Sequence, residues 1–226
     1  MSYIYSYRLT YFGGAAPCYD GEYLSLAICK RDMRRVIGDR ISKEGENDIW
    51  VIGIVGKKLE ESTKKNYVFT AEDILYIAKV ELAKTFDEYF GITGEKRADK
   101  IYIPDKVGRY SSNGVNFRPT PNNGVHDEEY LWDRDWDIAH SNRGKYVLIS
   151  KEYHFLSKGE SEELMGTTLK GCKLAKGVGH TWFLSEDNEL LKCLCDLTRK
   201  GNGVANLPES LRSCVKLEGC GKDKSI

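Results

Sequence analysis

A basic cluster stands near the start of the chain: Lys30, Arg31, Arg34 and Arg35. In a helix, residues four positions apart share a face, so Lys30 lies above Arg34. Guanidinium groups bind phosphate through paired hydrogen bonds, and we expect Lys30, Arg31 and Arg34 to hold the phosphate of a nucleotide from an exposed face. The alternative is a solvated helix face that nearby Asp32 neutralises.

Residues 126–140 combine carboxylates with two imidazoles. Such groups on one segment can form a general acid/base pair, and His126, Asp127 and His140 are the candidate catalytic residues. They can also form an oxygen-rich metal site, but no recognised metal-ligand spacing is present, and no metal is predicted. The alternative is that residues 126–140 form a solvated segment or a lid without catalytic groups. Trp132 precedes Trp136 by four residues, which predicts either a stack on a nucleotide base or a lid anchor.

Two glycine-containing segments are further candidates for nucleotide binding. Gly13 and Gly14 lie in a loop of small residues over 12–17, where missing side chains let the backbone approach a base or phosphate. A plain strand connection explains the same residues. His180 ends the turn formed by residues 177–179 and is a candidate donor to a base edge. A structural bond to a backbone carbonyl is the alternative for this histidine.

The elements that must position these residues follow from periodicity and turn signals. Basic residues 30–35 are compatible with a helix, and we expect a turn at Gly38-Asp39 to end it. Residues 92–144 are polar and too long for a plain connection, which indicates a functional loop. Residues 186–200 predict a helix that Ser185 caps, with Leu190, Leu194 and Leu197 buried. The other predictions are a short helix over 85–91 and strands over 3–11, 22–29, 49–55, 74–83 and 145–156.

This pattern predicts an α+β fold, with a curved or barrel-like mixed sheet decorated by short helices and a C-terminal helix. The 34 basic residues equal the 34 acidic ones, which disfavours tight binding to long duplex DNA but not binding of one nucleotide. The seven cysteines, with no apolar leader or membrane span, indicate a cytoplasmic protein with reduced thiols. Cys193 and Cys195 lack a second pair, so neither zinc nor any other cofactor is predicted.

Several segments, in order, resemble one family. They are Ser6-Tyr7, Ala16-Pro17, 26–30 with Arg34, Gly38-Asp39, 74–80, 86–89, 147–150 and Gly179-His180. Together they resemble the second nucleotide-modification-associated domain family, which occurs in bacteria and phages. After Gly38-Asp39 the chain departs from the family pattern, because residues 40–46 are polar. The Gly-Asp turn is also similar to the PUA-like group (PUA, ASCH and EVE domains), which implies a barrel.

The resemblance covers about residues 3–184. It implies a domain over 1–184, with residues 185–226 as a helix and tail packed on that domain. It also implies an association with modified nucleic-acid bases. We therefore expect a module that recognises a modified base or nucleotide, in free form or in nucleic acid, such as a sensor in phage–host conflict. One alternative is an enzyme that alters or removes a modified base, such as a transferase, hydrolase or glycosylase-like protein. Another is a partner-binding protein. The oligomeric state is not predicted.

Overall fold

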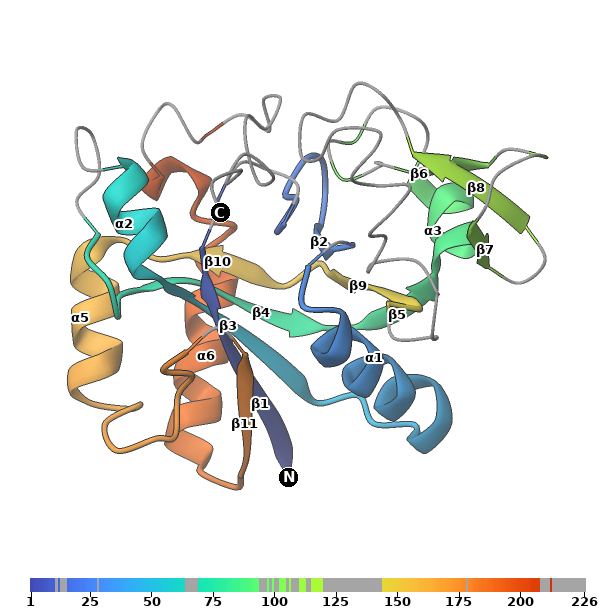
Figure 1. The fold of residues 1–226 in the computed structure, drawn as a ribbon. Helices are drawn as coiled ribbons and strands as arrows, with labels where there is room; N and C mark the ends of the chain where they lie inside the picture. Colours follow the sequence, from blue (N-terminus) through green and yellow to red (C-terminus); the bar gives the residue numbers. More distant parts are fainter. Residues whose placement is uncertain are drawn as a thin grey trace. The chain divides into compact units, whose positions relative to one another are not determined.

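The computed structural model describes residues 1–10, 12, 16–27, 29–63, 69–93, 97, 99, 102–104, 106, 110–112, 115–119, 144–177, 179–207 and 212. The chain forms two compact units whose segments alternate along the sequence (Figure 1). The first unit comprises residues 1–12, 46–81 and 150–212. The second unit comprises residues 13–45, 82–149 and 213–226.

The first unit contains a mixed five-stranded sheet in the order β10-β4-β3-β1-β11. Its strands are β1 (Ser2–Leu9), β3 (Ile49–Val55), β4 (Ile74–Val80), β10 (Tyr153–Phe155) and β11 (His180–Ser185). β1 runs parallel to β3, and the other neighbours are antiparallel. Every residue of β3 is buried, which explains why its β-branched residues do not alternate with polar ones.

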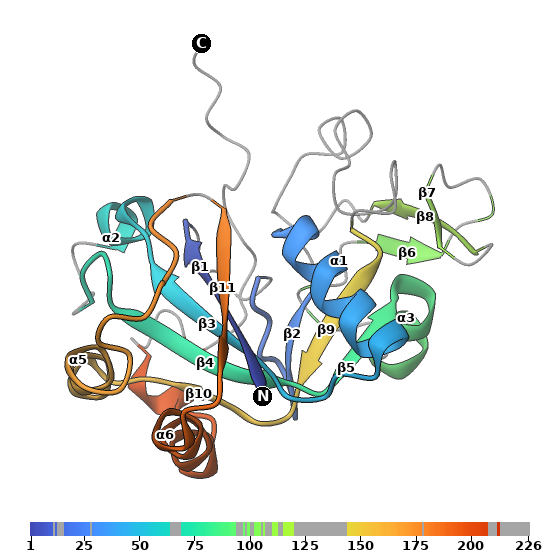
Figure 2. The same cartoon turned by 90° about the horizontal axis from the view of Figure 1, so that it is seen from below.

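Two helices cover one face of this sheet, as Figure 2 shows for α5 (Lys158–Gly166) and α6 (Asn188–Arg199). Their leucines pack with alternate residues of the strands in one apolar core, which includes Ile4, Trp50, Ile52, Ile77, Leu164, Leu190, Leu194 and Leu197. A capping box of Ser157 and Glu160 begins α5, and the Asp187 side chain caps α6. The unit also contains α2 (Lys57–Thr63) and the 3₁₀ turn η2 (Val204–Asn206).

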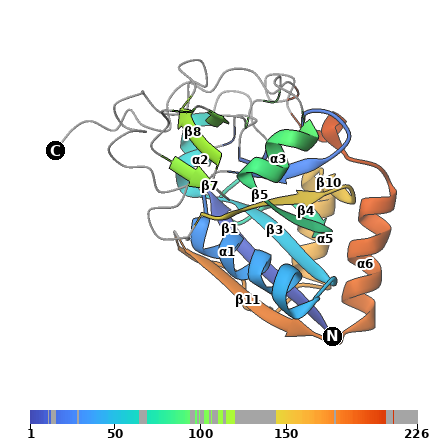
Figure 3. The ribbon, with the colours of Figure 1, turned by 90° about the vertical axis from the view of Figure 1, so that its right-hand side faces the viewer.

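The second unit contains two three-stranded sheets, in the orders β2-β9-β5 and β6-β8-β7. Figure 3 shows β7 and β8 of the second sheet side by side. Its helices are α1 (Arg31–Asp39), the π-helical η1 (Arg40–Glu44) and α3 (Phe86–Thr93). Its strands are β2 (Leu24–Leu26), β5 (Leu82–Thr85), β6 (Tyr102–Pro104), β7 (Tyr110–Ser112), β8 (Val115–Pro119) and β9 (Tyr146–Ser150).

The α+β prediction is confirmed. So are the strands at the N-terminus and at 49–55, and the C-terminal helix with its three buried leucines. The strand expected over 74–83 is two strands, β4 and β5, which belong to different sheets. The strand expected over 145–156 is likewise two strands of different sheets, β9 and β10. Of the strand expected over 22–29, the structure forms only the three residues of β2. Within the described residues the strands form open sheets, so the barrel-like form stays a prediction. The division of the chain at residue 184 also stays a prediction.

The turn expected at Gly38-Asp39 is wrong, because both residues belong to α1. Gly38 is needed for close packing instead, since a Cβ there would lie 2.1 Å from a ring carbon of Tyr146 on β9. Helical structure continues through η1 and stops at Gly45, whose φ of 72° suits a glycine. The cap expected from Ser185 is also wrong, because Ser185 ends β11 and Asp187 accepts from the first amides of α6.

Candidate functional site

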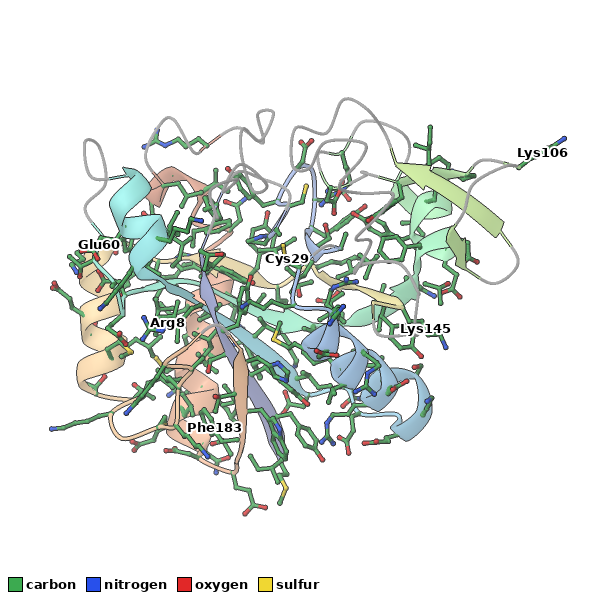
Figure 4. All side chains as sticks on the ribbon, viewed as in Figure 1. Arg8, Cys29, Glu60, Lys106, Lys145 and Phe183 are labelled. Atoms are coloured by element: carbon green, nitrogen blue, oxygen red, sulfur yellow. The ribbon has the colours of Figure 1, made fainter. Side chains whose placement is uncertain are left out.

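The connection between β2 and α1 contains two consecutive residues in the left-handed region. Cys29 has a φ of 61° and Lys30 a φ of 46°, and neither is glycine. This conformation costs roughly 1–2 kcal/mol per residue relative to the right-handed region, so surrounding contacts must hold it. Figure 4 shows Cys29 in this connection, just ahead of α1. The turn brings a half-buried thiol and a half-buried amine next to each other at the start of a helix.

The buried side chain of Arg34 holds this turn in place. Its Nε donates to the carbonyl of Cys29 at 2.8 Å. Its Nη1 donates to the carbonyls of Gly144 at 3.0 Å and Tyr146 at 2.5 Å, and the guanidinium lies 5.9 Å from the ring centre of Phe86. Arg34 therefore connects the start of α1 to the beginning of β9.

Lys30 occupies the N-cap position of α1. A lysine side chain offers no acceptor, and it makes no capping hydrogen bond to the first amides of the helix. Burial lowers the pKa of the Lys30 amine, while the neighbouring Cys29 acts in the opposite direction. Arg31 follows with a side chain that is 23 % exposed, 3.9 Å from the carboxylate of Asp32. The start of α1 thus combines helix amides with two cationic side chains, which is an arrangement that favours anions.

A second polar cluster in the same unit is fully hydrogen-bonded. The buried carboxylate of Asp99 accepts from the hydroxyls of Tyr89 at 2.6 Å and Ser25 at 2.5 Å. Arg97 donates to the same carboxylate at 3.3 Å and to the carbonyl of Cys18 at 3.2 Å. The pKa of Tyr89 is raised, first by burial and then by Asp99. Fully hydrogen-bonded buried networks rigidify the structure around them. This network includes Ser25 of β2, so it fixes the strand that leads into the turn at residues 29–30.

The ring of Tyr23 packs against this cluster on its more exposed side. The guanidinium of Arg97 lies 4.3 Å from the ring centre of half-buried Tyr23, whose pKa burial raises. The sequence did not point to Arg97, Asp99 or Tyr89, because the cluster joins residues that are far apart in the chain. A stacked arginine and tyrosine are side chains that nucleotide sites also use.

The predicted site residues fall into three groups. Lys30, Arg31 and Arg34 do come together at the start of α1, but Arg34 is buried and not on the exposed face that we expected. His180 begins β11 of the first unit and is half-buried, with its ring 6.3 Å from that of Tyr5. The remaining candidates lie outside the described residues: Gly13, Gly14, His126, Asp127, Trp132 and His140.

Other features of the described residues do not coincide with these candidates. A cavity of about 320 Å³ lies between α5 and α6 in the first unit, and its lining includes Glu163, Lys192 and Cys193. No cluster of three or more metal-ligating side chains occurs among the described residues. Nor does that part of the chain contain a helix that could cross a membrane.

Comparison with sequence families links the chain to a known domain. The sequence model of the family described as nucleotide modification associated domain 2 matches residues 1–213. No curated protein and no solved structure matches the chain. The matched range includes both the turn at residues 29–30 and the whole of α6.

Proposed function

We propose that this chain, which belongs to the nucleotide modification associated domain 2 family, recognises a modified nucleotide. Family membership links the chain to nucleotide modification. The observation that carries the finer proposal is the start of α1, where the side chains of Lys30 and Arg31 stand at the first amides of the helix. In this proposal, the N-terminal end of α1 binds the phosphate of the nucleotide.

The chemistry of this helix start supports a phosphate ligand. The first amides of a helix carry partial positive charge, and a lysine and an arginine add full charges beside them. Buried Arg34 holds the turn at residues 29–30, and the Arg97–Asp99 network holds the strand β2 that leads into this turn. The first amides of α1 are therefore oriented before a ligand binds. Preorganised donors bind anions without an entropic cost of ordering.

The base-recognising part of the proposal rests on residues in the sequence alone. Gly144, which Arg34 binds, comes four residues after His140 in the chain. We assign recognition of the base edge to His126, Asp127 and His140, stacking to Trp132, and close backbone approach to Gly13 and Gly14. The alternation of carboxylates and imidazoles suits exocyclic amines and ring nitrogens of a modified base. A sensor of modified nucleotides in phage–host conflict would need this division of tasks.

Calorimetric titration with a nucleotide and its matching nucleoside tests the phosphate site. Lys30→Gln and Arg31→Gln should each weaken nucleotide binding by about tenfold, the value of one charge-assisted hydrogen bond, and leave nucleoside binding unchanged. Lys43→Gln is the control, because Lys43 is 66 % exposed in η1 of the same unit. Equal losses for the two ligands, or none, would remove the phosphate assignment. Asp127→Asn should instead change the discrimination between bases.

The turn also favours a second candidate function, an enzyme that alters or removes a modified base. Burial lowers the pKa of Lys30, which is the direction that favours a nucleophilic amine. The test is to incubate the protein with nucleosides from hypermodified DNA and follow conversion by mass spectrometry. Turnover that Lys30→Gln abolishes would establish the enzyme, whereas retention of unconverted nucleosides would support the recognition module.

A further inference from the structure

We propose that the cavity between α5 and α6 binds a linear aliphatic diamine, whose two ammonium groups meet carboxylates and whose hydrocarbon chain covers the apolar floor. The cavity has a volume of about 320 Å³, which is the size of a site for a small ligand. It lies in the first unit and shares no residue with the nucleotide site proposed at the start of α1. The cavity therefore adds a second ligand, and its chemistry does not depend on the proposed function.

Contacts at one end of the cavity fix how the two helices run along it. Lys200, just after the end of α6, donates from Nζ to Glu160 Oε1 in the first turn of α5 at 3.0 Å. Thr167 and Thr168, just after α5, and Glu189 in the first turn of α6 also line the cavity. The two helices, which lie side by side in Figure 2, are therefore antiparallel here, and the Glu160–Lys200 pair closes one end.

The floor of the cavity is apolar. Leu164 and Leu197 line it and belong to the core beneath the helices, with exposures of 2 % and 7 %. Half-buried Cys193 lines the cavity as well and packs against the same core. Contact with methylene groups would remove the accessible part of this floor from water, which favours a ligand with a hydrocarbon body.

The rim of the cavity favours positive charge. Its lining contains four carboxylates and two amines, so its net charge is −2, although the whole chain is neutral. The carboxylates are those of Glu160, Glu163, Glu189 and Asp196, and the amines are those of Lys192 and Lys200. This local charge favours a cation over an anion, which separates the ligand of this cavity from a nucleotide.

Two of the four carboxylates remain for the ligand. Glu160 is occupied by Lys200 and by the cap of α5. Asp196 has an arginine of its own helix at 3.5 Å and Lys192 one helical turn before it. Within the described part of the chain, neither Glu163 nor Glu189 forms an ion pair, and both are exposed. Two carboxylates without a partner match the two ammonium groups of a diamine.

The spacing of these two carboxylates sets the length of the ligand. At a rise of about 1.5 Å per residue, Glu189 lies about 16 Å along α6 from Lys200, and Glu163 about 4.5 Å along α5 from Glu160. The backbones of Glu163 and Glu189 are therefore roughly 11 Å apart along the cavity. Flexible side chains shorten this span, so that a chain of about six carbons can bridge the two carboxylates.

Calorimetric titration of the full chain with hexamethylenediamine tests this site. Hexanediol and adipate, of similar chain length but neutral and anionic, should bind at least about tenfold more weakly. Glu163→Gln and Glu189→Gln should each weaken diamine binding by about threefold, which corresponds to the loss of one exposed ion pair. Glu162→Gln is the matched control, because Glu162 is 65 % exposed on α5 and does not line the cavity. It should leave the affinity unchanged.

A change in the floor provides a second test. The longer side chain in Cys193→Met would occupy part of the cavity, so this variant should weaken diamine binding more than either glutamine variant, with an unchanged circular dichroism spectrum. Equal affinity for hexanediol, or unchanged diamine affinity in the double variant Glu163→Gln, Glu189→Gln, would overturn the proposal. So would a dimer that Cys193→Met dissociates, because a second copy would then fill the cavity. Lys30→Gln should not change diamine binding, so this proposal and the phosphate assignment can fail independently.

Discussion

The Arg34→Ala variant should lose much of the stability of the second unit, although its sequence context suggested an exposed phosphate ligand. Arg34 is fully buried, and its guanidinium donates to the carbonyls of Cys29, Gly144 and Tyr146. Alanine would leave three carbonyls without this donor, those of buried Gly144 and Tyr146 and that of half-buried Cys29. It would also release the left-handed turn at residues 29–30.

The magnitude follows from the hydrogen bonds. An unsatisfied buried polar group costs about 1–3 kcal/mol, and water entering the space of the lost side chain would compensate part of the sum for three. We therefore expect the free energy of unfolding to fall by about 3–5 kcal/mol. Arg34→Lys should recover part of the loss, because an ammonium can reach fewer of the three carbonyls.

Urea denaturation followed by far-UV circular dichroism measures this loss. Arg35→Ala is the control, because Arg35 is the next residue of the same helix with a 42 % exposed side chain, 3.8 Å from Asp39. It should cost less than about 0.5 kcal/mol. If Arg34→Ala also cost less than about 1 kcal/mol with an unchanged m-value, the structural role given to Arg34 would be refuted, and its role in ligand binding would regain weight.

Four further outcomes are expected. Leu194→Ala should lower the free energy of unfolding in urea by about 2–5 kcal/mol, because Leu194 is fully buried in α6. Gly38→Ala should cost about 1–3 kcal/mol in the same assay, since the new Cβ meets the ring of Tyr146. Burial would raise the pKa of Glu160, but hydrogen bonds from the Ser157 amide and neighbouring side chains lower it to about 2 from 4.5. The folded-state pKa is therefore depressed, so the stabilisation is present above pH 4.5 and is lost as the pH falls toward 2; Glu160→Gln should flatten this part of a stability-versus-pH curve. All seven cysteines should react with a thiol reagent in the denatured, unreduced protein, as the five described cysteines are free.

Local pattern was sufficient for the elements whose signals are continuous. The strand at 49–55 is a run of β-branched residues, and the helix over 188–199 repeats leucine at helical spacing, so both were predicted. α5 was missed although it has a signal, because Ser157 and Glu160 stand at the spacing of a capping box. β11 was missed because the glycines before it suggested a turn, and its apolar residues Trp182, Phe183 and Leu184 are consecutive, without the alternation that marks a half-buried strand.

The candidate site could be predicted only where its residues are neighbours in the chain. Lys30, Arg31 and Arg34 were recognised from their spacing, but the burial of Arg34 depends on Gly144 and Tyr146, more than 100 residues away. The contact between Arg97 and Ser25 likewise spans 72 positions, and no local pattern indicates it. Tertiary contacts of this length decide whether a charged residue is a ligand-binding group or part of the framework.

The balanced charge of the whole chain is consistent with binding phosphate, because charge acts over short distances. At physiological salt, interactions between exposed charges are largely screened beyond about 8 Å, so a ligand responds to the nearest residues. Residues 164–185 contain three lysines and no carboxylate, whereas residues 127–137 contain six carboxylates and one arginine. A net charge of zero for the whole chain is therefore compatible with segments of opposite charge. The net charge weighs against long duplex DNA, whereas the charge of the nearest residues decides where a single phosphate can bind.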